Sequence, residues 1–209
     1  MLNLLIIIFT MTLTYLAVAG RLDTYIRVIV VQGVLLFGIA FLELAEIDPF
    51  NLLFILLETL IFKSILVPYF TSRAIKRNGL KHEIEPGVSN FYSVFIVIGF
   101  VIGSFVVAYQ LHDTQLKVTY FTASISSLLT GLFLIVSRKS IVTHLIGYMV
   151  IENGIFLLSL ALGSELPMIV NYGILLDLFT SVLILITFVN RIGDVFKSSH
   201  ITSLTELKD

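Results

Sequence analysis

Cysteine is absent from the 209-residue sequence. Without a thiolate, this chain cannot form a disulfide, ligate an iron–sulfur cluster, hold zinc through sulfur or use a cysteine nucleophile. Any redox centre with which the protein works is therefore expected in a partner chain, and no cofactor is expected in this one.

Histidine is scarce and scattered. The four histidines fall on different segments, and none shows a metal-ligand or haem-like spacing. We therefore expect no metal site in this chain. The histidines are His82, His112, His144 and His200.

Charged residues are also few. Asp, Glu, Lys and Arg make up 13% of the sequence, whereas 57% is hydrophobic, and the mean hydropathy is +1.03. A soluble domain could not bury so much apolar surface, so the lipid bilayer is the expected surrounding. The formal net charge of -1 also lacks the concentrated basic face that binding of nucleic acid requires.

Apolar runs, separated by charged or proline-containing breaks, predict seven membrane-spanning helices in a single membrane domain over residues 1–209. Each span is predicted to be helical because lipid offers no partner to an unpaired backbone group. The expected fold class is therefore an all-α, multi-pass transmembrane helix bundle. The predicted spans are residues 2–19, 26–45, 50–70, 91–110, 119–136, 141–163 and 168–190.

The connections between the spans alternate in charge. The odd-numbered connections are basic and the even-numbered ones are acidic or sparse, with Arg138 and Lys139 in the fifth and Glu165 in the sixth. By the positive-inside bias, the amino terminus is predicted outside and the carboxyl terminus in the cytoplasm. The loop 71–90 and the tail 191–209 are then cytoplasmic, and the basic loop fits either contact with anionic lipid or docking of a partner.

Several charged or titratable residues fall inside the predicted spans. A charged group at the centre of a bilayer costs on the order of 2.5–3.5 kcal/mol even on the mildest scale, so such residues usually face the bundle interior and mark an ion or proton path. We expect such a path here. The residues are Glu43, Glu58, Lys63, His144, Glu152 and Asp177.

In the third span, Glu58 and Lys63 are five residues apart, or about 140° around an α-helix, so they are not expected to pair along one face. Their partners are therefore predicted on other helices. Pro68 removes a backbone donor and frees the carbonyl of Ser64, which creates a polar spot one turn from Lys63. The alternative for Lys63 is that its side chain extends to the membrane surface.

The sixth span carries His144, Tyr148 and Glu152. Tyr148 and Glu152 are four residues apart on one face, and His144 lies a turn further toward the predicted cytoplasmic end. This spacing predicts a ladder of protonatable groups that rises to mid-membrane, with Asn153 available to hydrogen-bond a neighbouring helix. The alternative is a protonated Glu152 that serves only as a hydrogen-bond donor between helices.

The seventh span carries Asp177 on a stripe of small residues that includes Gly173 and Ser181. Such a stripe allows close helix approach and favours a position for the aspartate in a helix interface. The short connection 163–167 makes the last two spans antiparallel neighbours, so Glu152 and Asp177 are predicted at similar depth. Two carboxyls together in a low dielectric disfavour simultaneous ionisation, which suits groups that bind and release protons.

Small residues on two other spans are expected to serve helix packing. Close approach of helices in a membrane needs small side chains at the contact. These residues are Gly99 and Gly103 on the fourth span and Thr122, Ser124, Ser126, Ser127 and Thr130 on the fifth.

Several stretches resemble hydrogenase-4 component E, the multi-span membrane subunit of group 4 energy-converting hydrogenases and formate hydrogenlyases. The resemblance runs over nearly the whole chain. The stretches that carry it are FKSILVPYF at 62–70, IVSRKSIVTHLIGYMVIENG at 135–154, YGILLDLFTSVLILI at 172–186 followed by Arg191, and SLTELKD at 203–209.

The last three spans also resemble the three-helix K subunit of respiratory complex I and its counterpart in multisubunit cation antiporters. The shared features are a basic pair at Arg138 and Lys139, the sequence LIG, an asparagine, and an acidic residue in the next helix. That family has one glutamate in each of its last two helices. Asp177 matches the second glutamate, whereas the first falls at Met149, three residues before Glu152 and on nearly the same face.

The resemblance implies a non-catalytic membrane-arm subunit of an oxidoreductase complex that couples redox chemistry to the translocation of protons or sodium ions. It implies antiporter-like membrane subunits, a quinone-site-like foot subunit and cytoplasmic hydrogenase subunits as partners, with nickel–iron and iron–sulfur centres in those partners. The implied location is a bacterial or archaeal cytoplasmic membrane. The predicted relay residues are Glu58, Lys63, His144, Tyr148, Glu152 and Asp177.

Two other functions remain open. A related antiporter or ion-driven uptake complex without a hydrogenase would suit the same residues, because it differs only in the partner chains. An independent transporter or intramembrane enzyme is disfavoured, since the sequence shows no repeated half with broken helices and no paired nucleophile and base.

Overall fold

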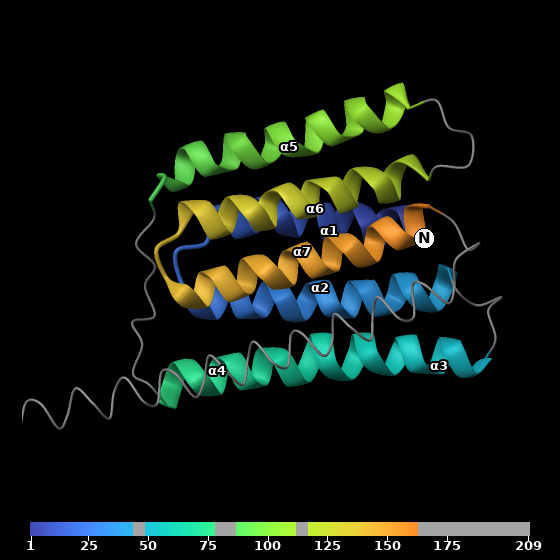
Figure 1. Ribbon diagram of the computed structural model, residues 1–209, viewed down its shortest axis with the longest axis horizontal. Helices are drawn as coiled ribbons and strands as arrows, with labels where there is room; N and C mark the ends of the chain where they lie inside the picture. Colours follow the sequence, from blue (N-terminus) through green and yellow to red (C-terminus); the bar gives the residue numbers. More distant parts are fainter. Residues whose placement is uncertain (44–48, 78–86, 112–116, 163–209) are drawn as a thin grey trace, which may run out of the picture.

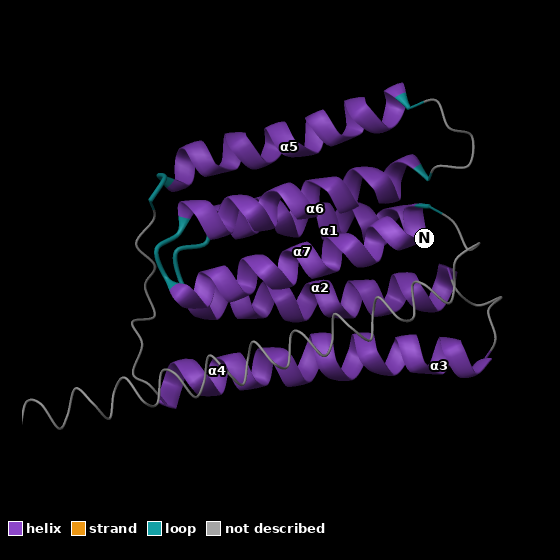
Figure 2. Ribbon diagram, in the orientation of Figure 1, coloured by secondary structure: helices purple, strands orange, loops and turns teal. Residues whose placement is uncertain are grey.

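The computed structural model describes residues 1–43, 49–77, 87–111 and 117–162. Within these ranges every regular element is a helix (Figure 2). Five of the helices are long and apolar enough to cross a membrane, which makes this a multi-pass membrane protein with an all-helical described part. The five candidate spans are Leu22–Glu43, Ile55–Arg73, Asn90–Gln110, Val118–Ser137 and Val142–Ala161.

The first six predicted spans correspond to helices. The predicted seventh span, 168–190, lies outside the described residues. The first helix has 17 residues and is about 25 Å long, somewhat short for a hydrocarbon core of about 30 Å. The elements are α1 (Leu2–Val18), α2 (Leu22–Glu43), α3 (Pro49–Leu57), η1 (Glu58–Leu66), α4 (Val67–Arg77), α5 (Asn90–Gln110), α6 (Val118–Ser137) and α7 (Ile141–Ala161).

The third helix, formed by α3, η1 and α4 in succession, is longer than predicted. The prediction ended this span at residue 70 and began a loop at 71, but α4 continues to Arg77. Its last turns are polar, and arginine is a good helix former, so the helix persists after its apolar part has ended. The predicted loop 71–90 is therefore helical as far as Arg77.

Successive helices run antiparallel (Figure 1). In this view α1 and α2 lie behind α6 and α7, α5 flanks α6 on one side, and the third helix flanks α2 on the other. The most extensive contact joins α6 and α7. The described part of the bundle therefore has an inner group of α1, α2, α6 and α7 and two outer helices.

Glycines bring the backbones of α6 and α7 together. A Cβ atom built on Gly131 would lie 2.5 Å from the carbonyl oxygen of Gly147. Beside this contact, Ser127 Oγ donates a hydrogen bond to the carbonyl oxygen of Val150 at 2.7 Å. The serine- and threonine-rich helix α6 thus serves helix packing, as predicted.

The prediction that Gly99 and Gly103 serve helix packing is wrong for the described part of the chain. Nothing there lies within 4 Å of a Cβ atom built on either glycine. The face of α5 that is turned toward the bundle carries Val97, Ser104 and Ala108, which are buried. The two glycines therefore lie on other faces of this outer helix.

Different contacts tie the two ends of the bundle. At the end with the amino terminus, Lys117 forms an ion pair with Glu43, and its backbone N–H donates to the carbonyl oxygen of Ala161 at 3.4 Å. At the other end, the guanidinium of Arg138 donates to the carbonyl oxygen of Ala17 at 2.9 Å. The connections that begin at residues 19 and 138 therefore lie at the same end of the bundle. Which side of the membrane this end faces stays a prediction.

Candidate functional site

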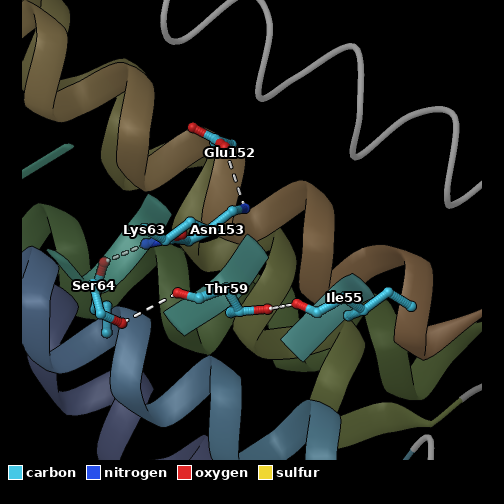
Figure 3. A network of polar contacts seen from close by, with 7 residues as sticks. Ile55, Thr59, Lys63, Ser64, Glu152 and Asn153 are labelled. Atoms are coloured by element: carbon cyan, nitrogen blue, oxygen red, sulfur yellow. Dashed lines mark hydrogen bonds and ion pairs between the residues drawn. The ribbon is translucent and has the colours of Figure 1, made fainter. Parts of the chain in front are cut away.

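An ion pair lies inside the helix bundle. Lys63 Nζ of η1 is 3.2 Å from Glu152 Oε1 of α7, and the two side chains are only 8% and 7% exposed. Figure 3 shows the lysine beside α7. The prediction that Lys63 finds its partner on another helix is confirmed. Its side chain is enclosed by the bundle and does not extend to the surface.

The surroundings of the ammonium group are part apolar. Lys63 Nζ lies 5.4 Å from the centroid of the Phe156 ring, one turn beyond Glu152 on α7. The ring face adds a favourable cation–π contact, and the carboxylate compensates a charge that would be costly alone. Transfer of one proton from the ammonium to the carboxylate would leave two neutral groups, so the pair can exist in two states of equal total charge.

Lys63 lies in a π-helix. The nine residues of η1 follow the wider π geometry, in which backbone hydrogen bonds join residues five apart. Two side chains support this stretch, since Thr59 Oγ1 donates to the carbonyl oxygen of Ile55 at 2.5 Å and Ser64 Oγ donates to that of Thr59 at 3.2 Å (Figure 3). Pro68, just beyond η1, cannot supply an amide donor to the preceding turn.

The π geometry corrects one step of the sequence argument. The separation of about 140° between positions 58 and 63 assumed an α-helix. In a π-helix these two positions lie on successive turns and closer to one face than in an α-helix. The side chain of Glu58 is outside the described part of the structure, so its predicted relay role stays a prediction.

Beside the ion pair, a chain of side-chain hydrogen bonds crosses three helices. Asn153 Nδ2 of α7 donates to Gln32 Oε1 of α2 at 3.0 Å, and Gln32 Nε2 donates to Thr12 Oγ1 of α1 at 2.8 Å. Gln32 is completely buried, and Asn153 is 3% exposed. The prediction that Asn153 hydrogen-bonds a neighbouring helix is confirmed.

The other predicted relay residues on α7 lie nearer to its start. His144 is partly buried, and its Nε2 lies 2.9 Å from the carbonyl oxygen of Arg138. Because a carbonyl only accepts, that nitrogen carries the hydrogen in this contact. Tyr148 is also partly buried, one turn before Glu152. The three residues thus follow one another along α7, whereas Asp177 lies outside the described residues.

Sequence reasoning did not single out Gln32. Its only signal is a lone amide, followed by a glycine, within the apolar run VIVVQGVLLF at 28–37. Sequence reasoning also did not join Glu43 to the residues that it contacts at the bundle end. There Lys117 forms an ion pair with Glu43, and Tyr120 Oη donates to Glu43 Oε2 at 2.6 Å.

The described residues contain no group of three histidine, cysteine, aspartate or glutamate side chains that could hold a metal ion. Fold and site define a class: a multi-pass membrane protein with an enclosed ion pair between a lysine in a π-helix and a glutamate in an α-helix, flanked by buried amides. Proton or ion handling is the chemistry open to such groups.

Comparisons with known proteins show a distant relation to one named class. The chain is 31% identical to hydrogenase-4 component E of Escherichia coli strain K12 over 80 residues, which are 38% of this chain and 37% of that protein. The same figures apply to hydrogenase-4 component E of Shigella flexneri. Over 191 residues, it is 24% identical to the uncharacterised protein Rv0085 of Mycobacterium tuberculosis, covering 90% of this chain and 87% of that protein. No family model and no solved structure matches.

Proposed function

We propose that this chain is a membrane-arm subunit of a complex I-like energy-converting hydrogenase or formate hydrogenlyase, and that its buried pair takes part in the translocation of protons or sodium ions. The observation that carries the proposal is the enclosed contact of 3.2 Å between Lys63 and Glu152. The distant relation to hydrogenase-4 component E supports the choice of complex.

The energetics of a buried ion pair favour a functional role over a structural one. Two charges lose their hydration inside a helix bundle, and well-packed apolar residues of similar volume are often as stable or more so. Charged residues within membrane helices accordingly tend to mark ion or proton paths. A lysine and a carboxylate at 3.2 Å can in addition exchange a proton without a change in total charge.

In the proposed mechanism, a proton moves between the two side chains of the pair. Lys63 Nζ lies 3.2 Å from Glu152 Oε1, so the ammonium can pass its proton directly to the carboxylate. The carboxylic acid formed at Glu152 then passes that proton to the next group of the relay, and Lys63 takes up a new proton from the other side of the relay. His144 and Tyr148 precede Glu152 along α7 and would connect it to one end of the bundle, and Asp177 and Glu58 complete the proposed relay.

The proposed complex supplies the chemistry that this chain lacks. Nickel–iron and iron–sulfur centres belong to cytoplasmic hydrogenase subunits, and antiporter-like subunits and a quinone-site-like foot subunit are the membrane partners. This chain would bind ions and transmit their movement without a catalytic step of its own.

Two experiments test the proposal. The tagged chain is extracted from its native membrane in a mild detergent, and its stoichiometric partners are identified by mass spectrometry. A nickel-binding large subunit, iron–sulfur subunits and antiporter-like proteins are expected. Antiporter-like partners alone would instead indicate an antiporter or uptake complex without a hydrogenase, and recovery of the chain alone would refute both.

The second experiment measures ion translocation in inverted membrane vesicles. Glu152→Gln, Lys63→Met and the double variant are compared with wild type at equal amounts of assembled complex. The double variant is the decisive one, because it removes both charges and leaves neither unpaired. Loss of translocation with retained assembly is expected, and wild-type rates in the double variant would rule out the relay role.

A further inference from the structure

Three pairs of consecutive residues meet inside the bundle. They are residues 32–33 on α2, 63–64 on η1 and 152–153 on α7. Each pair contacts the other two: Lys63 is ion-paired with Glu152, Asn153 is hydrogen-bonded to Gln32, and Gly33 packs against Ser64. We call this arrangement the three-helix junction. Each of the three helices therefore contacts the other two here, and the ion pair between Lys63 and Glu152 is one of these three contacts.

The contact between α2 and η1 is close at Gly33, where any larger side chain would press against Ser64. A Cβ atom built there would overlap Ser64 Oγ and would lie 3.1 Å from both Cα and the backbone nitrogen of Ser64. The Ser64 hydroxyl would have to rotate away, and the Ser64 backbone would have to shift by a few tenths of an ångström. Because Ser64 follows Lys63 directly, this contact fixes the position of the lysine backbone relative to α2.

The contact between α2 and α7 fixes the orientation of the carboxylate. Consecutive residues on an α-helix point about 100° apart, so Glu152 and Asn153 leave α7 toward two different neighbours. The amide hydrogen bond of 3.0 Å between Asn153 and Gln32 holds one of these directions. With that direction fixed, Glu152 is directed toward η1, where Lys63 lies (Figure 3).

We propose that Gln32 and Gly33 are positioning residues that set the separation and orientation of Lys63 and Glu152. The inference rests on the proposed function for what the pair does, but the geometry is tested without it. Neither residue touches the transported ion in this proposal. α2 positions η1 through the contact of Gly33 with Ser64, and it positions α7 through the hydrogen bond of Gln32 with Asn153.

The test uses Gly33→Ala in the full chain, in its native membrane. The readout is the rate at which dicyclohexylcarbodiimide, which reacts with protonated carboxyls in membranes, modifies Glu152, followed by peptide mass spectrometry. The contact with Lys63 occupies the Glu152 carboxylate and so slows this reaction. Gly33→Ala pushes η1 away from α2, and labelling of Glu152 is expected to rise several-fold toward the rate in Lys63→Met, which removes the pair entirely.

Three further variants make the result specific. Gly99→Ala is the matched control, because the described structure leaves open space around that glycine, and it should label at the wild-type rate. Adding Ser64→Ala to Gly33→Ala removes the oxygen that the new methyl group would meet, so labelling should return part of the way to wild type. Gln32→Leu breaks the hydrogen bond to Asn153 and should raise labelling without the steric overlap.

Two outcomes would overturn the proposal. The first is that Gly33→Ala and Gln32→Leu label at the wild-type rate while Lys63→Met labels faster. The ion pair would then keep its geometry without the contacts that Gly33 and Gln32 make. The other is equal acceleration in Gly99→Ala, since any glycine substitution would then have the effect. Labelling does not depend on transport, so a failure of the proposed function would appear in the vesicle experiment alone.

Discussion

In the part of the chain that the structure describes, two lysine–glutamate pairs lie in very different surroundings. Lys63 and Glu152 lie inside the bundle with side chains 8% and 7% exposed, whereas Lys117 and Glu43 lie at its amino-terminal end with side chains 42% and 16% exposed. Both pairs join helices that are distant in the sequence. They differ in what surrounds the charges.

The difference in surroundings decides what each pair contributes. Exposed ion pairs contribute about 0–1 kcal/mol, because water competes for both charges. The inner pair is buried among protein atoms, and Gly33 packs closely against Ser64, the residue next to Lys63. The outer pair therefore secures one end of the bundle, whereas the inner pair depends on how accurately three helices fit together.

The largest expected effect comes from leaving one inner charge unpaired. Lys63→Met or Glu152→Gln alone should destabilise the purified protein by about 3–5 kcal/mol, the cost typical of an unpaired buried charge. The double variant Lys63→Met/Glu152→Gln should recover most of this loss. Equilibrium unfolding in detergent measures all three, and single variants as stable as the double one would contradict the enclosed pair.

A smaller loss is expected when α7 is pushed away from α6. A Cβ atom at Gly154 would lie 2.9 Å from the carbonyl oxygen of Ser124, so Gly154→Ala should cost about 1–3 kcal/mol through overpacking. Gly103→Ala, which meets open space in the described structure, serves as its control. Similar unfolding curves for the two variants would show that close packing beside the inner pair is unimportant.

At the outer pair, Tyr120→Phe removes one hydrogen bond to Glu43. The bond from Tyr120 Oη to Glu43 Oε2 is 2.6 Å long, and its loss should cost about 1 kcal/mol. The same unfolding measurement applies. A loss as large as that of Lys63→Met would mean that the outer cluster is as dependent on its partners as the inner one.

The smallest effect is expected for Lys117→Met. Its side chain is 42% exposed, so the loss should be about 0–1 kcal/mol and should shrink further as salt is added. In Lys63→Met, by contrast, the loss should change little with salt. Unfolding at low and high ionic strength distinguishes the two, and matching salt dependence would abolish the contrast between the pairs.

The helices were predictable from the sequence because hydrocarbon imposes a strong pattern. Runs of apolar residues gave the first six helices to within a few residues, apart from the extension of α4 to Arg77 and the early start of α2 at Leu22. The extension escaped prediction because polar residues end the apolar run without ending the helix. Hydropathy shows which residues can lie in lipid, but it does not show whether a helix has α or π geometry.

The site was predictable in its residues but not in its pairing. A charged side chain inside a span is conspicuous, so Lys63 and Glu152 were both candidates, and the partner of Lys63 was expected on another helix. The identity of the partner helix, however, follows from how η1 packs in the bundle, through its π geometry and its contact with Gly33. These arise from three-dimensional packing, and for the same reason Gln32 was overlooked.

The contact of Arg138 has a consequence for the order of biogenesis. The carbonyl oxygen of Ala17, at the end of the first helix, accepts its hydrogen bond from a residue 121 positions later in the chain. At translation rates of about 5–20 residues per second, that donor is synthesised roughly 6–24 s after its acceptor. During this interval the end of α1 needs another partner, such as water at the membrane surface. The end of α1 thus gains this hydrogen bond only after the chain as far as Arg138 has been made.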